Sequence, residues 1–340
     1  MTNYYSPSGH FKGGYWDRKV AKNLTGYREN LPKLMEASYA ENTWKKYSSA
    51  WKRFEAWCVD ENIAHIKPCE PLTVALYFSH LELKGSLRGA ITGAVEGIRW
   101  AHEAAGLASP TDVPFVKRIY EGAKRISPVN RNQKDPVKLE YIEELLRGVE
   151  QEKLSDLRFA VLLTLSFAGF FRISEILNFR VRDLTFESDA VKFFVRKAKN
   201  DQPAEGRFVF VARTPNFTCP IAILERYLKK ARIVDPDDYV IAHLKKGSDG
   251  AWVGEAKTPL SYSRARQILM DKFQPITEKV PDFNFGTHSG RIGGATTAKE
   301  AGVEDRLLDE HGRWKNPKSK NRYIRDSRNK KLAASKSLGL

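Results

Sequence analysis

The chain has 340 residues, of which 41% are hydrophobic and 11% aromatic, enough to build about two domains with a core in each; a mainly disordered chain is excluded. Lys and Arg number 57 against 41 Asp and Glu, so the formal net charge is +16, which indicates a polyanionic partner. The longest apolar run, residues 159–171, is too short to span a membrane and is interrupted by Thr164 and Ser166, so we expect no membrane association.

Other sequence signals exclude several classes of protein. No apolar signal segment lies at the N-terminus, so we expect an intracellular protein, in the nucleus of a eukaryote or in the cytoplasm and nucleoid of a prokaryote. Cys58, Cys69 and Cys219 are odd in number and widely spaced, which predicts neither a disulfide framework nor a zinc site. Motifs for nucleotide, dinucleotide, calcium and zinc-peptidase sites are absent from the sequence, so we expect no metal and no cofactor.

The first predicted elements are an arm and a helix. Residues 1–37 are rich in Tyr, Gly, Asn and Lys without periodicity, which predicts a flexible basic arm. Ser38 and Glu41 have the spacing of a capping box at the start of a helix. Aromatic and apolar side chains then follow on one helical face, and such a stripe is typical of core packing rather than of a ligand site. They are Trp44, Tyr47, Trp51, Phe54 and Cys58.

Three further helices complete the first predicted domain. They begin near Pro71, Ser86 and Pro114, each followed by apolar residues at helical spacing. Short connections between four helices predict a compact all-helical unit over residues 38–126. The polar, basic and proline-bounded stretch 127–138 has nothing to bury and is the predicted linker.

The second predicted domain, residues 139–330, is mostly helical with a small antiparallel sheet. Two Val- and Phe-rich runs, 190–195 and 207–211, predict a β-hairpin with a long polar loop. The tail, residues 331–340, follows a C-terminal segment that is dense in Lys and Arg. Helices are predicted over residues 139–150, 154–171, 220–231, 261–273 and 293–310 and around Tyr323.

Two charged clusters lie at predicted helix ends. Arg172 and Glu175 stand where an apolar helix ends, and taken alone they predict a structural ion pair, because an unpaired charge there would be costly. His288 and Arg291 are three residues apart on one helical face near a helix start, where main-chain N–H groups favour phosphate. The following glycines, Gly293 and Gly294, permit a close backbone approach. The HxxR pattern alone is equally typical of surface residues.

Two further clusters are basic. The hairpin loop carries Lys197 and Lys199, which taken alone predict a solvated turn. Trp314 and Tyr323 lie in a segment dense in Arg and Lys, where an aromatic residue usually packs or stacks.

The order and spacing of these clusters resemble the catalytic signature of the tyrosine recombinases, the integrase-type site-specific recombinases. An Arg, a Lys in a β-hairpin and HxxR are followed by Trp314, twenty-three residues after Arg291, and by Tyr323, nine residues later. The resemblance covers residues 38–330, and the Trp and the YIR sequence are similar to those of Cre-type members. The hairpin loop and the FAGFFRISEIL block also resemble recombinases of eukaryotic DIRS- and Crypton-type mobile elements. Gly169 departs from the family, whose glycine usually stands two residues before the first Arg.

The resemblance implies a two-domain fold, a helical core-binding domain and an α+β catalytic domain, that clamps double-stranded DNA as a homotetramer on two DNA sites. It implies that DNA is cut and rejoined through a 3′-phosphotyrosyl intermediate without metal or ATP. It implies that Glu175 orients the site, that either Lys197 or Lys199 protonates the leaving group, and that Lys199 is the stronger candidate. The implied catalytic residues are Arg172, Lys199, His288, Arg291, Trp314 and Tyr323.

Basic residues beside the catalytic positions are expected to contact the DNA backbone. These are Lys197, Arg313, Lys315 and Arg322. Two alternatives remain open: a type IB topoisomerase that relaxes DNA with similar chemistry, and a domesticated DNA-binding protein without catalysis.

Overall fold

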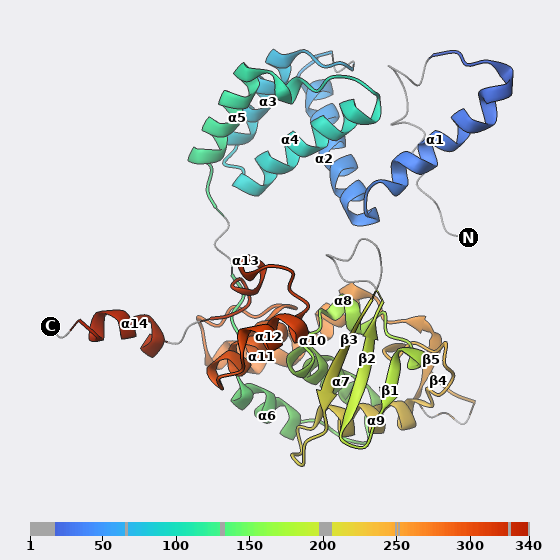
Figure 1. Ribbon diagram of the computed structural model, residues 1–340, viewed down its shortest axis with the longest axis vertical. Coiled ribbons are helices and arrows are strands. Elements are labelled where there is room, and N and C mark those ends of the chain that lie inside the picture. The colour runs from blue at the N-terminus through green and yellow to red at the C-terminus, as the bar shows by residue number, and fades with distance from the viewer. Residues whose placement is uncertain are drawn as a thin grey trace. The chain divides into compact units, whose positions relative to one another are not determined.

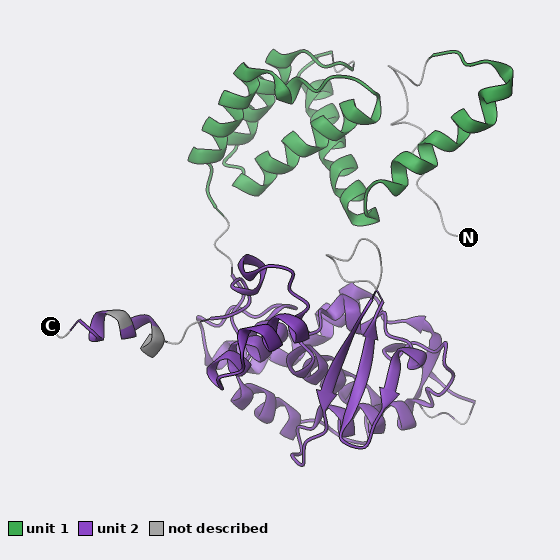
Figure 2. Ribbon diagram, in the orientation of Figure 1, with its two compact units in different colours: residues 1–131 green, residues 132–340 purple. Residues whose placement is uncertain are grey.

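A computed structural model describes residues 18–64, 67–129, 133–196, 206–248, 250, 252–325 and 328–338. Residues 1–17 of the predicted arm, together with Lys197 and Lys199, lie outside these ranges. The chain divides into two compact units, residues 1–131 and 132–340 (Figure 2). The described residues are mainly helical with small antiparallel sheets, as the sequence predicted. No helix among them is both long and apolar enough to cross a membrane.

The first unit is built from helices (Figure 1). They surround an aromatic core. Trp51 and Phe54 from the aromatic stripe are buried in it. The Trp44 ring meets Trp100 edge-on, with ring centroids 4.6 Å apart. The predicted core role of the stripe is therefore confirmed. The helices are α1 (Thr25–Ala37), α2 (Glu41–Asp60), α3 (Pro71–Leu83), α4 (Arg88–Ala104) and α5 (Pro114–Ile126).

Two expectations for the start of this unit are wrong. Residues 25–37 form helix α1 rather than part of an irregular arm, although Pro32 lies inside the helix. Pro32 removes one main-chain donor, but the Leu, Glu, Lys and Met around it are strong helix formers. Ser38 ends α1 instead of capping the next helix: its hydroxyl donates to the Met35 carbonyl, and α2 begins at Glu41.

The second unit contains a three-stranded sheet, a separate hairpin and nine α-helices among its described residues. The predicted β-hairpin is confirmed, and its first strand is central in the order β1-β2-β3. The β4–β5 hairpin was not predicted. The strands are β1 (Leu184–Phe186), β2 (Ala190–Val195), β3 (Arg207–Ala212), β4 (Ala242–Lys246) and β5 (Trp252–Pro259). The helices are α6 (Leu139–Arg147), α7 (Leu154–Ala168), α8 (Ile173–Ile176), α9 (Pro220–Ala231), α10 (Tyr262–Lys279), α11 (Ser289–Glu300), α12 (Asp305–Gly312), α13 (Pro317–Lys320) and α14 (Arg328–Lys336).

Left-handed backbone positions explain two differences from the predicted helices. Helix α7 ends at Ala168, three residues early, because Phe170 adopts a φ of 46°. The predicted helix over 293–310 is divided into α11 and α12, with Gly302 at a φ of 85° between them. Tyr323 lies in the turn after α13 and not within a helix.

The second half of the predicted linker belongs to the second unit. Val137 is 1% exposed and contributes to the core of this unit. Its main-chain N–H donates to the Ser289 carbonyl at 3.0 Å, and the Asp135 N–H donates to the Asn284 carbonyl at 3.1 Å. A single apolar residue in a polar stretch thus anchors residues 133–138 against the start of α11.

Close packing of α11 against neighbouring backbone segments determines where the candidate site lies. A Cβ atom at Gly294 would lie 2.0 Å from the Phe167 carbonyl oxygen, and one at Gly293 would lie 2.1 Å from the Val137 carbonyl oxygen. These glycines therefore allow the backbone of α11 to touch that of its neighbours, as predicted. The approach brings Arg291 beside the turn that follows α7.

Candidate active site

Arg172 and Glu175 pair at the start of α8. The Arg172 main-chain N–H donates to Glu175 Oε2 at 2.8 Å, and its Nη1 donates to Glu175 Oε1 at 2.6 Å. The Glu175 side chain is 5% exposed and that of Arg172 is 14% exposed. Because little water reaches this pair, leaving either charge without a partner would be costly.

Arg291 is fully buried and its guanidinium is held by two carbonyls. Nη1 donates to the Phe170 oxygen and Nη2 to the Gly312 oxygen, each at 2.6 Å. The Phe170 oxygen also accepts from Arg313 at 3.3 Å. Phe170 stands two residues before Arg172, where the family usually carries glycine, and its left-handed backbone costs about 1–2 kcal/mol that a glycine would avoid. Two charge-assisted hydrogen bonds to this carbonyl offset that strain.

The aromatic residues singled out in the sequence surround Arg291. Its guanidinium carbon lies 5.2 Å from the Trp314 ring centroid and 4.8 Å from that of Tyr323. The two rings are 5.5 Å apart, and the His288 ring lies 6.2 Å from the Tyr323 ring. Tyr323 is half-buried and His288 is exposed. The HxxR pair and the Trp–Tyr pair, separated by more than twenty residues in the chain, therefore meet at one place.

Arg313 lies in the interior, in contrast to the DNA contact expected from its sequence position. Its side chain is 1% exposed, and Nη2 donates to Glu175 Oε2 at 2.8 Å. Nη1 donates to the His311 carbonyl at 3.1 Å. Its guanidinium also lies over the Phe171 ring, 5.1 Å from the centroid. Arg313 is therefore part of the interior charge cluster, as Arg291 is, and is not one of the exposed basic residues expected along the DNA backbone.

Three guanidiniums thus surround one carboxylate. Burial raises the pKa of Glu175, but Arg313, then Arg172 and then Arg291 lower it, and the net shift is downward. Burial is the largest cause that lowers the pKa of Arg291, and Arg172 and Arg313 lower it further. Arginine stays charged at neutral pH, so the cluster carries a net positive charge.

Three buried N–H groups of this cluster have no hydrogen-bond partner among the described residues. They are Arg291 Nε, Arg313 Nε and Trp314 Nε1. Buried donors are nearly always satisfied in folded proteins, so unpaired donors beside excess positive charge indicate a place for an anionic ligand.

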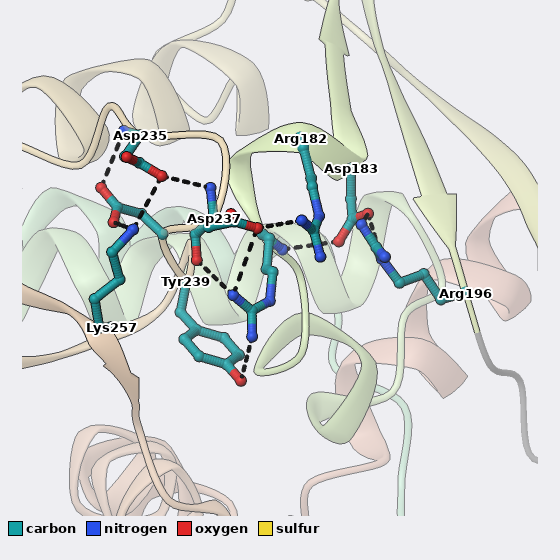
Figure 3. A network of polar contacts seen from close by, with 9 residues as sticks. Arg182, Asp183, Arg196, Asp235, Asp237, Tyr239 and Lys257 are labelled. Atoms are coloured by element: carbon teal, nitrogen blue, oxygen red, sulfur yellow. Dashed lines mark hydrogen bonds and ion pairs between the residues drawn. The ribbon is translucent and has the colours of Figure 1, made fainter.

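The other predicted basic residues have different surroundings. Lys315 and Arg322 are exposed near the site. At the base of the hairpin, Arg196 Nε donates to Asp183 at 2.6 Å, and the Asp183 side chain is 1% exposed (Figure 3). Arg182 pairs with Asp237 in the same polar network. This network fixes the end of β2, directly before the lysine-bearing loop.

Sequence reasoning missed two polar residues that support the site. His311 Nε2 lies 2.8 Å from the Ala168 carbonyl, so this nitrogen must carry the proton, and burial lowers the pKa of His311. Lys320 is buried and pairs with Asp305 and Asp309, each at 3.3 Å, which ties α13 to α12. The sequence offered a signal only for His311, which lies three residues before Trp314.

Comparison with known proteins decides the family. The model of the "Phage integrase family" matches residues 137–330, more than half of the chain. The chain belongs to the phage integrase family. It is a site-specific tyrosine recombinase that acts on DNA, as the sequence predicted.

Similar proteins are consistent with this assignment. The integrase/recombinase xerD homolog of Selenomonas ruminantium is 27% identical over 295 residues, which cover 85% of this chain and 83% of that protein. Recombinase cre of Escherichia phage P1 is 23% identical over 319 residues, covering 88% and 89%.

Solved structures share the fold. The Tn1549 transposon integrase in complex with transposon right end DNA matches with a TM-score of 0.54 and 14% identity, over 95% of this chain and 96% of that one. A lambda integrase dimer bound to a COC′ core site matches with a TM-score of 0.51 and 13% identity, over 92% and 83%.

Proposed function

We propose that this recombinase cuts and rejoins duplex DNA through a covalent bond between Tyr323 and the 3′-phosphate of the cut strand. The observation that carries the proposal is that Arg172 and Arg291 flank one buried carboxylate, Glu175. The Trp314 and Tyr323 rings lie against the Arg291 guanidinium. Net positive charge and unpaired buried donors, among them Arg291 Nε and Trp314 Nε1, suit a phosphodiester better than a neutral ligand.

The chemistry follows from these positions. Tyr323 Oη attacks phosphorus as the bond to the 5′-oxygen breaks, which leaves a 3′-phosphotyrosyl link and a free 5′-hydroxyl. His288, whose ring lies 6.2 Å from that of Tyr323, is the acid/base for the tyrosine proton. Arg172, Arg291 and the Trp314 indole N–H stabilise the charge that builds on the non-bridging oxygens. In the second step the 5′-hydroxyl of the partner strand displaces Tyr323 and restores a phosphodiester.

The leaving 5′-oxygen needs a proton, which a lysine of the hairpin loop supplies. Lys199 is our assignment, with Lys197 as the other candidate; both lie outside the described residues. Arginine and lysine provide the positive charge that metal ions provide in two-metal nucleases, so no metal is needed. The phosphotyrosine bond conserves the energy of the phosphodiester, so no ATP is needed.

The remaining roles follow from the resemblance and from charge. We propose that the first unit is the core-binding domain and the second the catalytic domain, with Lys315 and Arg322 on the DNA backbone. Four protomers would act on two DNA sites, and the source would be a eukaryotic mobile element of the DIRS or Crypton type. The structure of a lambda integrase dimer on a core site supports assembly on DNA for that relative.

A trapping experiment tests the proposal. The protein first selects its site from a random duplex pool, and that site is then made with a nick next to the cleavage position so that the cut fragment diffuses away. In EDTA and without ATP, the wild type should form a covalent adduct that is stable in SDS, and Tyr323→Phe should not. An adduct with Tyr323→Phe, or a requirement for Mg²⁺, would contradict the assignment. Relaxation of supercoiled DNA without recombinants would favour a topoisomerase.

A further inference from the structure

We infer that Arg313 is a positioning residue, which holds Glu175 so that Arg172 and Arg291 stay aimed at the DNA phosphate. This inference rests on the proposed function and assigns a role within the same site. Its starting point is that Arg313 is enclosed by the protein, with a side chain that is 1% exposed.

The two oxygens of Glu175 accept hydrogen bonds from two arginines, Arg172 and Arg313. Oε1 accepts from Arg172 Nη1 at 2.6 Å, whereas Oε2 accepts from the Arg172 main chain and from Arg313 Nη2, each at 2.8 Å. Arg291 Nη1 lies 3.8 Å from Oε2, beyond hydrogen-bond distance. Arg313 therefore takes the place on Oε2 that Arg291 would otherwise fill.

This division determines where Arg291 points. With Oε2 occupied, both terminal nitrogens of Arg291 donate to main-chain carbonyls, those of Phe170 and Gly312. If Arg313 were removed, the attraction between opposite charges in a dry site would draw Arg291 across the remaining gap to Oε2. Its guanidinium would then rotate away from the Tyr323 ring, which lies 4.8 Å from it.

Arg313 also fixes the backbone that carries Trp314. It ends α12 in the left-handed conformation, with a φ of 56°, and its N–H donates to the Glu310 carbonyl at 3.1 Å. Its side chain donates back to the Phe170 carbonyl, in the turn before Arg172. Arg313 thus connects the turn before Arg172 to the segment that leads to Tyr323.

Lys315 provides a matched control. It is also basic and lies two residues further along the chain, but it is exposed. A residue that contacts DNA and a residue that positions the site should change different measured quantities: the first changes the affinity and its salt dependence, and the second changes the cleavage rate on bound DNA.

The test compares Arg313→Met with Lys315→Met in the adduct assay, at saturating DNA and in single turnover. We expect Arg313→Met to cleave about 100-fold more slowly, because small displacements of catalytic groups have effects of this size, with a Kd for DNA within about threefold of wild type. Lys315→Met should weaken binding and reduce the slope of log K against log salt by about one.

A double-variant measurement shows whether Arg313 acts through Glu175. Adding Arg313→Met to Glu175→Gln should slow cleavage by less than threefold further, since the carboxylate that Arg313 holds is already gone. The pH profile is a second readout: without Arg313, the pKa of Glu175 rises, so Arg313→Met should gain an acidic limb that wild type lacks. Arg313→Lys keeps the charge but not the planar set of guanidinium N–H donors, and it should recover part of the cleavage rate. It also replaces Arg313→Met in the test if Arg313→Met does not fold.

Three results would overturn the inference. Arg313→Met could weaken DNA binding and reduce its salt dependence while bound DNA is cleaved at the wild-type rate. The effects of Arg313→Met and Glu175→Gln could add fully. Arg313→Lys could fold and cleave at the wild-type rate. If the wild type itself formed no adduct, the proposed function would fail together with this role; an active wild type with any of the three results overturns only the role of Arg313.

Discussion

Replacing Glu175 with Gln should destabilise the second unit strongly, although the two side chains have nearly the same shape. The Glu175 carboxylate accepts three hydrogen bonds at 2.6–2.8 Å from Arg172 and Arg313, and Arg291 lies 3.8 Å away. Gln keeps one acceptor oxygen and turns an NH₂ group toward a guanidinium. Breaking a buried ion pair by neutralising one partner costs about 3–5 kcal/mol. For a unit of this size the expected fall in Tm is about 10 °C.

Urea unfolding at pH 7, followed by the fluorescence of the tryptophans, measures this loss. The matched control is Glu225→Gln, which breaks an exposed pair with Arg213 whose two contacts are 2.6 and 2.9 Å long. Exposed pairs contribute about 0–1 kcal/mol, so the control should be close to wild type. A loss for Glu175→Gln no larger than that for Glu225→Gln would refute the reasoning, because burial would then have no effect on the cost.

The difference in unfolding free energy between wild type and Glu175→Gln should change with pH in a definite direction. The pKa of Glu175 is lowered in the folded protein from its ordinary value of 4.5. A lowered folded-state pKa means that the ionised carboxylate stabilises the fold fully above the unfolded-state value, and that this stability is lost as pH falls through the folded value. The difference between wild type and Glu175→Gln should therefore be constant from pH 6 to 8, as about 1.5 units above that value suffice for full ionisation, and should shrink in acid.

Three further predictions concern packing, the lysines and the hairpin base. Gly294→Ala places a Cβ 2.0 Å from a main-chain oxygen of α7 and should lower the free energy of unfolding by about 1–3 kcal/mol. The control Gly122→Ala, whose Cβ would meet nothing within 4 Å, should raise that free energy by about 0.5–1 kcal/mol. Equal effects of the two variants in urea unfolding would contradict this prediction. Of Lys199→Ala and Lys197→Ala, only the first should abolish cleavage, and a substrate with sulfur as the 5′ leaving atom should restore it, because a thiolate leaves without a proton; failure of that rescue would argue against a general acid. Asp183→Asn removes the charge that pairs with Arg196 at the end of β2 and should slow cleavage of bound DNA about tenfold without changing the Kd, a result that a purely structural pair would not give.

Much of the fold follows from local patterns. Pro71, Pro114 and Pro220 stand at the first positions of α3, α5 and α9, as the preference of proline for helix starts predicts. The β2–β3 hairpin follows from two short Val- and Phe-rich runs. Helix α1 could not be predicted, because Pro32 is locally a helix breaker and the pattern around it is weak.

The backbone before Arg172 shows where local patterns fail. Sequence reasoning placed Gly169 one position away from the usual family glycine. The structure has Phe170 in that position, in a left-handed conformation that few non-glycine residues adopt. Two guanidiniums from distant segments hold its carbonyl, so the conformation depends on contacts that no local window contains.

The sequence by itself determined the kind of chemistry, because the order and spacing of the candidate residues can be read without knowing their contacts. These residues are Arg172, His288, Arg291, Trp314 and Tyr323. Only the tertiary structure decided which charges belong to the interior. Arg313 and Lys315 are neighbours in one basic segment, and nothing local distinguishes them. Glu175, 138 positions earlier in the chain, supplies the partner that allows Arg313 to be buried. A buried charge needs a partner of opposite sign, and only the folded chain brings that partner to it.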